Sequence, residues 1–141
     1  MTSSKRPFYR LVVFSSFLFA LLSDQVLKLF VSQRVPVTIN TGISFGWLSG
    51  NVVVLGLIVI YIAFFEFSCR YWHKPYPFAS GLVLGGALSN IIDRIVIGGV
   101  RDFLPVPFLG IQNNLADWWI VLGLAWILYQ TTFRGTKQTE S

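Results

Sequence analysis

Residues 78–98, FASGLVLGGALSNIIDRIVIG, form the stretch that decides the fold of this chain. The stretch is mostly apolar and has the length, about 20 residues, that a helix needs to cross a lipid bilayer. Gly81, Gly85 and Ser89 follow one another at four-residue spacing, and small residues on one side of a helix let a neighbouring backbone approach closely. The stretch therefore predicts a membrane helix with one tightly packed face.

Three further apolar segments of similar length accompany this helix, at residues 11–30, 51–67 and 115–133. The chain is 54% hydrophobic and only 12% charged, which excludes an ordinary soluble domain. Because backbone polar groups in lipid must be bonded within their own segment, each segment is expected to be helical. The sequence thus predicts one all-α membrane domain over residues 1–141, with four transmembrane helices. A cleaved signal peptide is the alternative for the first segment.

The basic residues predict how the helices are oriented. Lysine and arginine are enriched on the cytoplasmic side of membrane proteins, and seven of the eleven flank one set of helix ends. These seven are Lys5, Arg6, Arg10, Arg70, Lys74, Arg134 and Lys137. Both termini are then expected in the cytoplasm, and loops 32–50 and 99–113 on the outer side, where a small β element is expected. The net charge of +5 follows from this topology and predicts no nucleic-acid partner.

Four aspartates stand in or beside the apolar segments, all toward the predicted outer ends. They are Asp24, Asp93, Asp102 and Asp117. An ionisable side chain at membrane depth costs roughly 2.5–3.5 kcal/mol on insertion scales, and such residues are usually functional. Their clustering near one face therefore predicts a site, and carboxylates in a site predict acid–base chemistry.

Asp102 and Asp117 are the candidate catalytic pair. The loop between them contains proline and glycine and must return to the membrane, which can bring the two carboxylates together. Two neighbouring carboxylates do not both ionise easily and share a proton. The ionised one can then deprotonate water while the protonated one donates to a carbonyl oxygen or a leaving amine. The structural alternative is that both aspartates merely lie at helix ends, where an acid in the first turn is favourable in any case.

Polar residues at helical spacing lie near this pair. Asn90 and Arg94 share one face of a helix, and Asp93 lies three residues after Asn90. Asp24 and Lys28 are also four residues apart, which predicts a local ion pair. These groups either clamp the helices to one another or brace the aspartates and a substrate.

No metal or cofactor site is expected. The single histidine, His73, and the single cysteine, Cys69, fall near the predicted cytoplasmic helix ends, away from the aspartates. A histidine-based metal site is hard to build from one histidine on the wrong side. We therefore expect both residues to be ordinary interface residues, without an internal disulfide.

In their order along the chain these residues resemble the motifs of signal peptidase II, the bacterial lipoprotein signal peptidase family. The matching segments are DQVLK at residues 24–28, NTGISFG at 40–46, NIIDR at 90–94, GGVRDF at 98–103 and NLAD at 114–117. Each motif is short, but their shared order over four predicted helices is specific. The chain departs from the family pattern at Ser89, where glycine is usual, at Asn113, where phenylalanine is usual, and in the short stretch 28–40.

The resemblance implies an intramembrane aspartic endopeptidase in the bacterial cytoplasmic (inner) membrane, with its site at the outer, periplasmic face. By position, Asp102 and Asp117 are then the catalytic pair. The residues implied to bind substrate or support the site are Asp24, Lys28, Asn40, Gly42, Asn90, Asp93, Arg94 and Asn114. The implied substrates are diacylglyceryl-modified prolipoproteins, cleaved just before the lipid-bearing cysteine. Membrane lipids are the other implied partners, and no cofactor or obligate protein partner is expected.

Two other function classes are compatible with aspartates in a small membrane protein. A small proton-coupled transporter would also carry carboxylates in its helices, but would distribute them across the membrane depth. A non-catalytic assembly partner would use the stripe of small residues 81–89 to bind another chain. The clustering of the four aspartates toward one face favours the peptidase.

Overall fold

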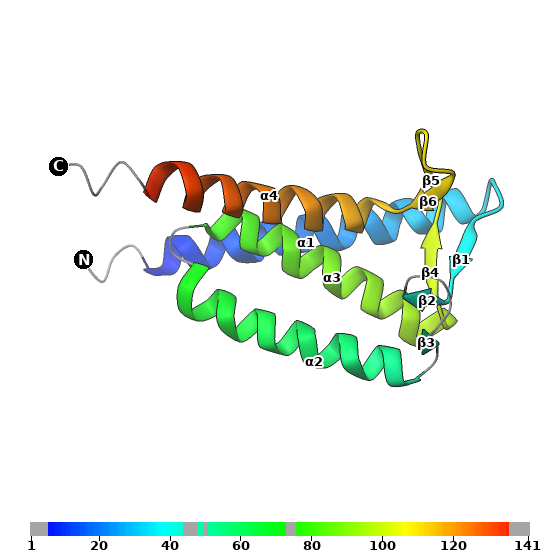
Figure 1. The fold of residues 1–141 in the computed structure, drawn as a ribbon, viewed down its shortest axis with the longest axis horizontal. Helices are drawn as coiled ribbons and strands as arrows, with labels where there is room; N and C mark the ends of the chain where they lie inside the picture. The colour runs from blue at the N-terminus through cyan, green and yellow to red at the C-terminus, as the bar shows by residue number, and fades with distance from the viewer. Residues whose placement is uncertain (1–5, 44–47, 50, 73–75, 136–141) are drawn as a thin grey trace.

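The structure, a computed structural model, describes residues 6–43, 48–49, 51–72 and 76–135. Four long helices run along its longest axis: α1 (Arg6–Ser32), α2 (Asn51–Phe67), α3 (Pro77–Ile97) and α4 (Leu115–Gly135). In Figure 1, α1 begins and α4 ends at the same end of the bundle, whereas the strands gather at the opposite end. The predicted helical class is therefore confirmed.

Several helices extend beyond the predicted apolar segments. α1 begins at Arg6 instead of residue 11, and α2 continues into a π-helical turn, η2 (Ser68–Trp72). An apolar run marks the part of a helix suited to hydrocarbon, whereas backbone hydrogen bonding continues into the polar flanks. Among the described residues, three helical segments are long and apolar enough to cross a membrane: Phe8–Ser32, Val54–Tyr71 and Pro77–Ile97.

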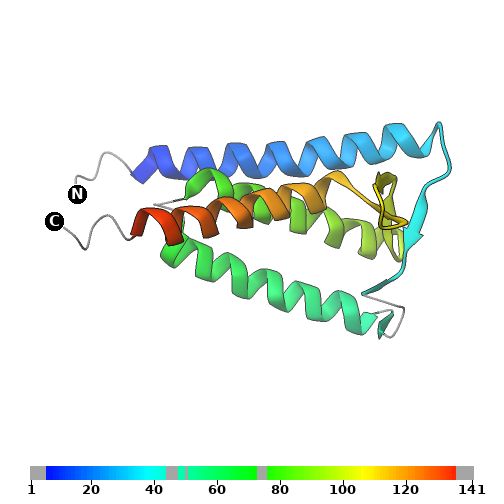
Figure 2. The same cartoon turned by 45° about the horizontal axis from the view of Figure 1, so that its top comes forward.

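α3 is the central helix because small residues bring its neighbours close. A Cβ atom built on Gly81 would lie 1.9 Å from Ser16 Oγ of α1, and Gly85 meets the same helix. On another side, a Cβ on Gly86 would lie 2.6 Å from Ala116 O of α4. The predicted packing stripe is therefore the α1–α3 interface. Figures 1 and 2 show α2 diverging from α1 and α4 toward the strand end.

Three pairs of short antiparallel strands form the predicted β element. β1 (Thr38–Asn40) pairs with β4 (Val100–Asp102), β2 (Gly42–Ile43) with β3 (Leu48–Ser49), and β5 (Leu104–Val106) with β6 (Ile111–Asn113). In the first pair, Thr38 lies opposite Asp102. The first outer loop thus runs directly beside the strand that carries one candidate catalytic aspartate.

Gly98 ends α3 and turns the chain into β4. Its φ of 76° lies in the left-handed region, which glycine adopts without strain, and its N–H donates to Arg94 O at 3.2 Å. This turn returns the chain across the end of the bundle. Asp102 is thereby brought back beside the helix that precedes it.

Several predictions concern residues outside the described ranges, namely Lys5, His73, Lys74, Lys137 and motif residues 44–46. Cys69 is described, and its thiol is free and exposed in η2. The segment η2 follows α2 at the end of the bundle away from the strands (Figure 1), so Cys69 lies away from the aspartates, as predicted.

Candidate active site

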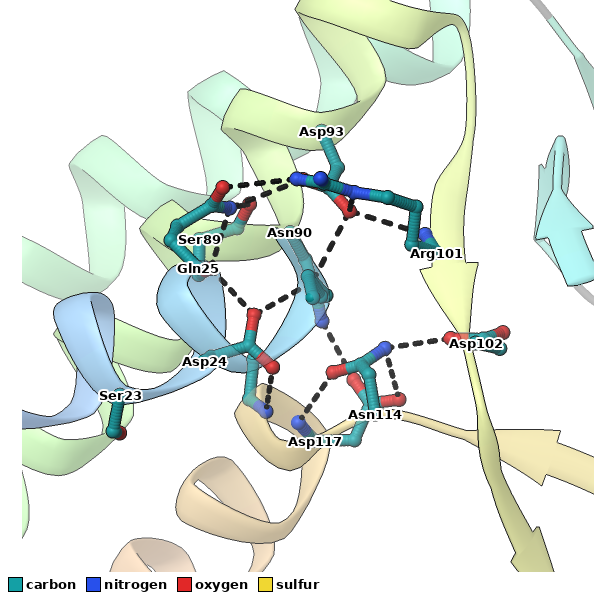
Figure 3. A network of polar contacts seen from close by, with 12 residues as sticks. Ser23, Asp24, Gln25, Ser89, Asn90, Asp93, Arg101, Asp102, Asn114 and Asp117 are labelled. Atoms are coloured by element: carbon teal, nitrogen blue, oxygen red, sulfur yellow. Dashed lines mark hydrogen bonds and ion pairs between the residues drawn. The ribbon is translucent and has the colours of Figure 1, made fainter. Parts of the chain in front are cut away.

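The two candidate catalytic aspartates are joined by one side-chain amide. Asn114 Nδ2 donates to Asp102 Oδ1 at 2.7 Å and to Asp117 Oδ2 at 3.1 Å (Figure 3). Asn114 immediately precedes α4, and its Oδ1 accepts the N–H of Asp117 at 3.0 Å, so it caps this helix. Helix capping therefore fixes the amide that holds the carboxylates together, although the aspartates lie on different elements.

Each carboxylate accepts a second amide from another part of the fold. Asn40 Nδ2 on β1 donates to Asp102 Oδ2 at 3.1 Å. Asn90 Nδ2 on α3 donates to Asp117 Oδ1 at 2.6 Å. Asp102 is buried, whereas Asp117 is half-buried and borders a cavity. Neutral amide donors orient both carboxylates, so the pair itself can carry the proton that acid–base chemistry requires.

A buried lysine determines which way Asn90 points. Lys28 Nζ donates to Asn90 Oδ1 at 3.0 Å and forms ion pairs with Asp24 at 2.6 Å and Asp93 at 3.2 Å. The side chains of all three charged residues are fully buried. Because an ammonium group can only donate, the amide oxygen of Asn90 must face Lys28 and its NH₂ group must face Asp117. The predicted Asp24–Lys28 pair is present and also reaches the site.

Asp24 on α1 ties this helix to α3 and α4. It accepts the hydroxyl of Ser89 at 2.6 Å and the backbone N–H of Ala116, in the first turn of α4, at 2.8 Å. Ser89 also accepts a hydrogen bond from Gln25 Nε2 at 2.8 Å. The departure from glycine at position 89 thus adds a hydroxyl to the network, which a glycine could not supply.

Asp93 faces Arg101, not the candidate pair Asp102 and Asp117. The Asp93 carboxylate accepts from the backbone N–H, Nε and Nη2 of Arg101 at 3.0, 3.2 and 2.6 Å (Figure 3). Nη2 of Arg101 also donates to Gln25 Oε1 at 3.0 Å. Arg101 directly precedes Asp102 on β4, so these contacts hold that strand against α3. Sequence reasoning assigned no role to Arg101 or Gln25. The sequence signal that could have indicated this contact is an acid, Asp93, and a base, Arg101, eight residues apart on either side of Gly98.

A cavity of about 510 Å³ opens beside Asp117, between α2, α3 and α4. Its polar lining comes from Asn40, Asn90, Arg94 and Asp117, and its apolar lining includes Leu57, Ile60, Tyr61, Phe64, Ile91 and Ile120. The Nε atom of Arg94 is buried and lacks a hydrogen-bond partner among the described residues. The cavity therefore combines apolar walls with a few polar groups near the aspartates, which suits an extended peptide with apolar side chains.

Gly42 pairs with Ser49 between β2 and β3, and its role in a site stays a prediction. Across the described ranges, no group of three or more histidine, cysteine, aspartate or glutamate side chains could hold a metal ion.

Comparisons with known proteins show which sequences this chain resembles. A family model described as signal peptidase (SPase) II matches residues 16–133. A protein named lipoprotein signal peptidase from Rhodopseudomonas palustris is 36% identical over 141 residues, covering 79% of this chain and 86% of the relative. One of the same name from Halothermothrix orenii is 31% identical over 137 residues, covering 83% and 92%.

Two solved structures share the fold. One, described as a bacterial membrane enzyme solved by the in meso method at 2.3 Å, has a TM-score of 0.71 at 25% identity and covers 85% of this chain and 89% of its own. The other, described in the same words at 1.9 Å, has a TM-score of 0.74 at 24% identity and covers 86% and 92%. The arrangement of helices and strands is thus one that membrane enzymes use.

Proposed function

The chain belongs to the signal peptidase II family, and on that premise we propose that it is a lipoprotein signal peptidase of the aspartic type. One observation carries the proposal: Asp102 and Asp117 accept hydrogen bonds from the same amide nitrogen of Asn114. Two carboxylates held together in this way can act as a general base and a general acid on one peptide bond.

In the proposed reaction the pair shares one proton before the substrate is cleaved. The ionised carboxylate takes a proton from water as the water oxygen attacks the scissile carbonyl carbon. The protonated carboxyl group donates to the carbonyl oxygen. The tetrahedral intermediate then collapses as its C–N bond breaks: the leaving amine receives the proton taken from water, and the other carboxylate takes a proton from a hydroxyl of the intermediate, which restores the shared proton. Asn40, Asn90 and Asn114 keep the carboxylates oriented throughout, because each amide donates to a carboxylate oxygen.

The proposed substrates are diacylglyceryl-modified prolipoproteins, cleaved just before the lipid-bearing cysteine. The cavity beside Asp117 would take the residues next to the cleavage site, and its apolar walls match the apolar end of a signal peptide. The guanidinium group of Arg94, a residue that lines this cavity, would donate to a substrate carbonyl. An acylated substrate stays in the membrane, where a site at the ends of membrane helices can meet it.

We further propose that α4 also crosses the membrane, so that residues 1–141 form one four-helix domain with both termini cytoplasmic. α4 runs along α3 for much of its length in Figures 1 and 2, and is of equal length at 21 residues. Arg10 and Arg70 lie at the end opposite the strands, which favours that end as the cytoplasmic one. The aspartates then lie at the periplasmic face of the bacterial inner membrane, in contact with membrane lipids.

The test is cleavage of a diacylglyceryl-modified prolipoprotein by the purified full chain in detergent. We expect wild type to cleave it, and Asp102→Asn and Asp117→Asn each to lose at least about a thousandfold in kcat, because neither variant retains a proton-sharing pair. Glu66→Gln is the matched control, since it removes an exposed acid near the C-terminal end of α2, away from the two aspartates.

Thermal unfolding of each variant separates lost chemistry from lost folding. Wild-type rates in both folded asparagine variants would contradict the aspartic mechanism. An inactive wild type would favour a transporter or an assembly partner. No described contact favours those classes at present, because the four aspartates lie near the strand end and Glu66 is exposed.

A further inference from the structure

The β5–β6 hairpin is the segment that connects the two catalytic candidates. Asp102 ends β4 two residues before β5 begins, and Asp117 follows β6 by four residues. The pairing continues toward the aspartates, because the N–H of Phe103 donates to Asn113 O at 2.9 Å. A displacement of this hairpin would therefore be transmitted to both carboxylates.

The hairpin is uncharged, and the apolar side chains at and just after its tip are exposed. No residue from 103 to 116 is charged. Phe108 is 105% exposed, Leu109 is 67% exposed and Ile111 is 56% exposed. Loops that face water are usually polar, whereas apolar and aromatic side chains without charges are typical of segments that enter a lipid interface.

Phe108 also occupies a backbone conformation that does not suit it. Its φ is 68°, in the left-handed region that glycine adopts freely and a bulky residue adopts only at a cost. The following turn residue Gly110 has a similar φ of 64°. Phe108 therefore strains the turn without burying its ring, and no contact within the described residues offsets that strain.

The direction of the hairpin identifies what lies around its tip. In Figure 1 the hairpin projects sideways from the strand end of the bundle, beyond α4 and across the direction of the helix axes. Helices that cross a membrane lie near its normal, so a segment perpendicular to them lies along the membrane surface. Trp118, in the first turn of α4, is partly exposed near the base of the hairpin, and tryptophan favours the same interface.

We propose that the tip of the β5–β6 hairpin, Phe108 and Leu109, inserts into the lipid interface of the outer leaflet and sets the depth of Asp102 and Asp117. The partner is a lipid surface. The insertion itself depends only on membrane spanning by the helices. The consequence for catalysis rests on the proposed function, because a diacylglyceryl-bearing substrate presents its peptide bond at a defined depth.

The insertion is tested by spin-label accessibility in the full chain, reconstituted in phosphatidylcholine–phosphatidylglycerol vesicles. Cys69→Ala removes the single cysteine, and Phe108→Cys or Gln33→Cys then supplies one site for a nitroxide. We expect the label at 108 to collide with oxygen and to be shielded from a water-soluble nickel chelate. The label at 33, on the exposed turn after α1, should show the opposite. Equal nickel accessibility at both positions would overturn the insertion.

The depth-setting role is tested by cleavage of lipidated substrate in the same vesicles. Phe108→Asp/Leu109→Asp should lower the initial rate roughly tenfold, because charges resist entry into the interface. The matched control Phe108→Leu/Leu109→Phe, which keeps the tip apolar, should stay near wild type. In detergent micelles, which adapt to the protein, the aspartate variant should recover, and this recovery also shows that it is folded.

Equal rates for the two double variants in vesicles would remove the link between the hairpin and catalysis. A wild type without activity would refute the proposed function and leave the accessibility result standing, so the two failures are distinguishable.

Discussion

Two ion pairs in this protein share the same spacing and length but have opposite surroundings. Asp24 and Lys28 on α1 are four residues apart and 2.6 Å from each other, and so are Glu66 and Arg70 on α2 and η2. The first pair is 0% exposed on both sides, whereas the second is 58% and 66% exposed. Of these two pairs with the same spacing and length, only the buried one contacts the candidate site, through the bond from Lys28 to Asn90.

The difference extends to the helices that carry the pairs. α1 lies so close to α3 that the glycines of α3 leave no room for a side chain, and their shared end holds the charged network. α2 carries Gly56, at which an added Cβ would meet nothing within 4 Å, and cavities open along its inner face. The α1–α3 side forms a rigid frame for the aspartates, and the α2 side leaves space for a substrate.

The largest effect is expected from removing the buried cation. Lys28→Met leaves buried Asp24 without a cation and leaves Asp93 with Arg101 as its remaining cation, which should destabilise the protein by roughly 3–5 kcal/mol. The variant also frees the Asn90 amide to rotate, so any folded fraction should have a lower kcat. Unfolding by denaturing detergent, followed by circular dichroism, measures the loss. A change below about 1 kcal/mol would show that the network is not a structural frame.

A smaller loss is expected when α1 is pushed away from α3. In Gly81→Val, the new Cβ would lie only 1.9 Å from Ser16 Oγ, so α1 must move away. This overpacking should cost about 3 kcal/mol of stability. Gly56→Val is the matched control in α2, where the Cβ meets open space, and should be nearly neutral. The same unfolding measurement applies to both variants. Similar losses in the two would contradict the contrast between the two sides.

Arg101 should affect catalysis more specifically than it affects stability. Arg101→Met removes charge-assisted bonds to Asp93 and should cost roughly 2 kcal/mol of stability. Because β4 then keeps only the backbone N–H of residue 101 as a donor to Asp93 on α3, kcat should fall about tenfold with KM little changed, as expected for a residue that positions Asp102. Arg101→Lys keeps one cation and should recover part of kcat. A change in KM alone would argue against positioning.

The smallest effect is expected at the exposed ion pair. Arg70→Met removes a pair that is accessible to solvent at both side chains, and should change stability by less than about 1 kcal/mol and leave cleavage unchanged. Raising the salt concentration should have little effect on wild type for the same reason. A loss similar to that of Lys28→Met would show that burial does not distinguish the two pairs.

The helices and the tight helix interface could be predicted from local patterns. Apolar runs of membrane length define where the helices are, and the spacing of Gly81 and Gly85 predicts a close neighbour. The same patterns missed the start of α1 at Arg6 and the turn η2, because polar flanks continue a helix without contributing to its hydropathy. They also could not say which helix packs on the glycines, since spacing defines a face and not its partner.

The aspartates of the site could be named from the sequence, but their contacts could not. Asp102 and Asp117 were recognisable as acids beside apolar segments within an ordered set of motifs. The bridging amide of Asn114 depends on how the chain returns from the hairpin, and the orientation of Asn90 depends on Lys28, 62 residues away. Arg101 was overlooked because its partner Asp93 faces it only once Gly98 reverses the chain.

The sequence by itself determined a helical membrane protein with its four aspartates gathered at one end, because hydrophobic length and charge placement are properties of each segment alone. Only the tertiary structure decided that Asp24–Lys28 is buried and Glu66–Arg70 is exposed, although the two pairs have the same local form. The reason is that desolvation depends on which neighbours exclude water from a group, and those neighbours come from distant parts of the chain.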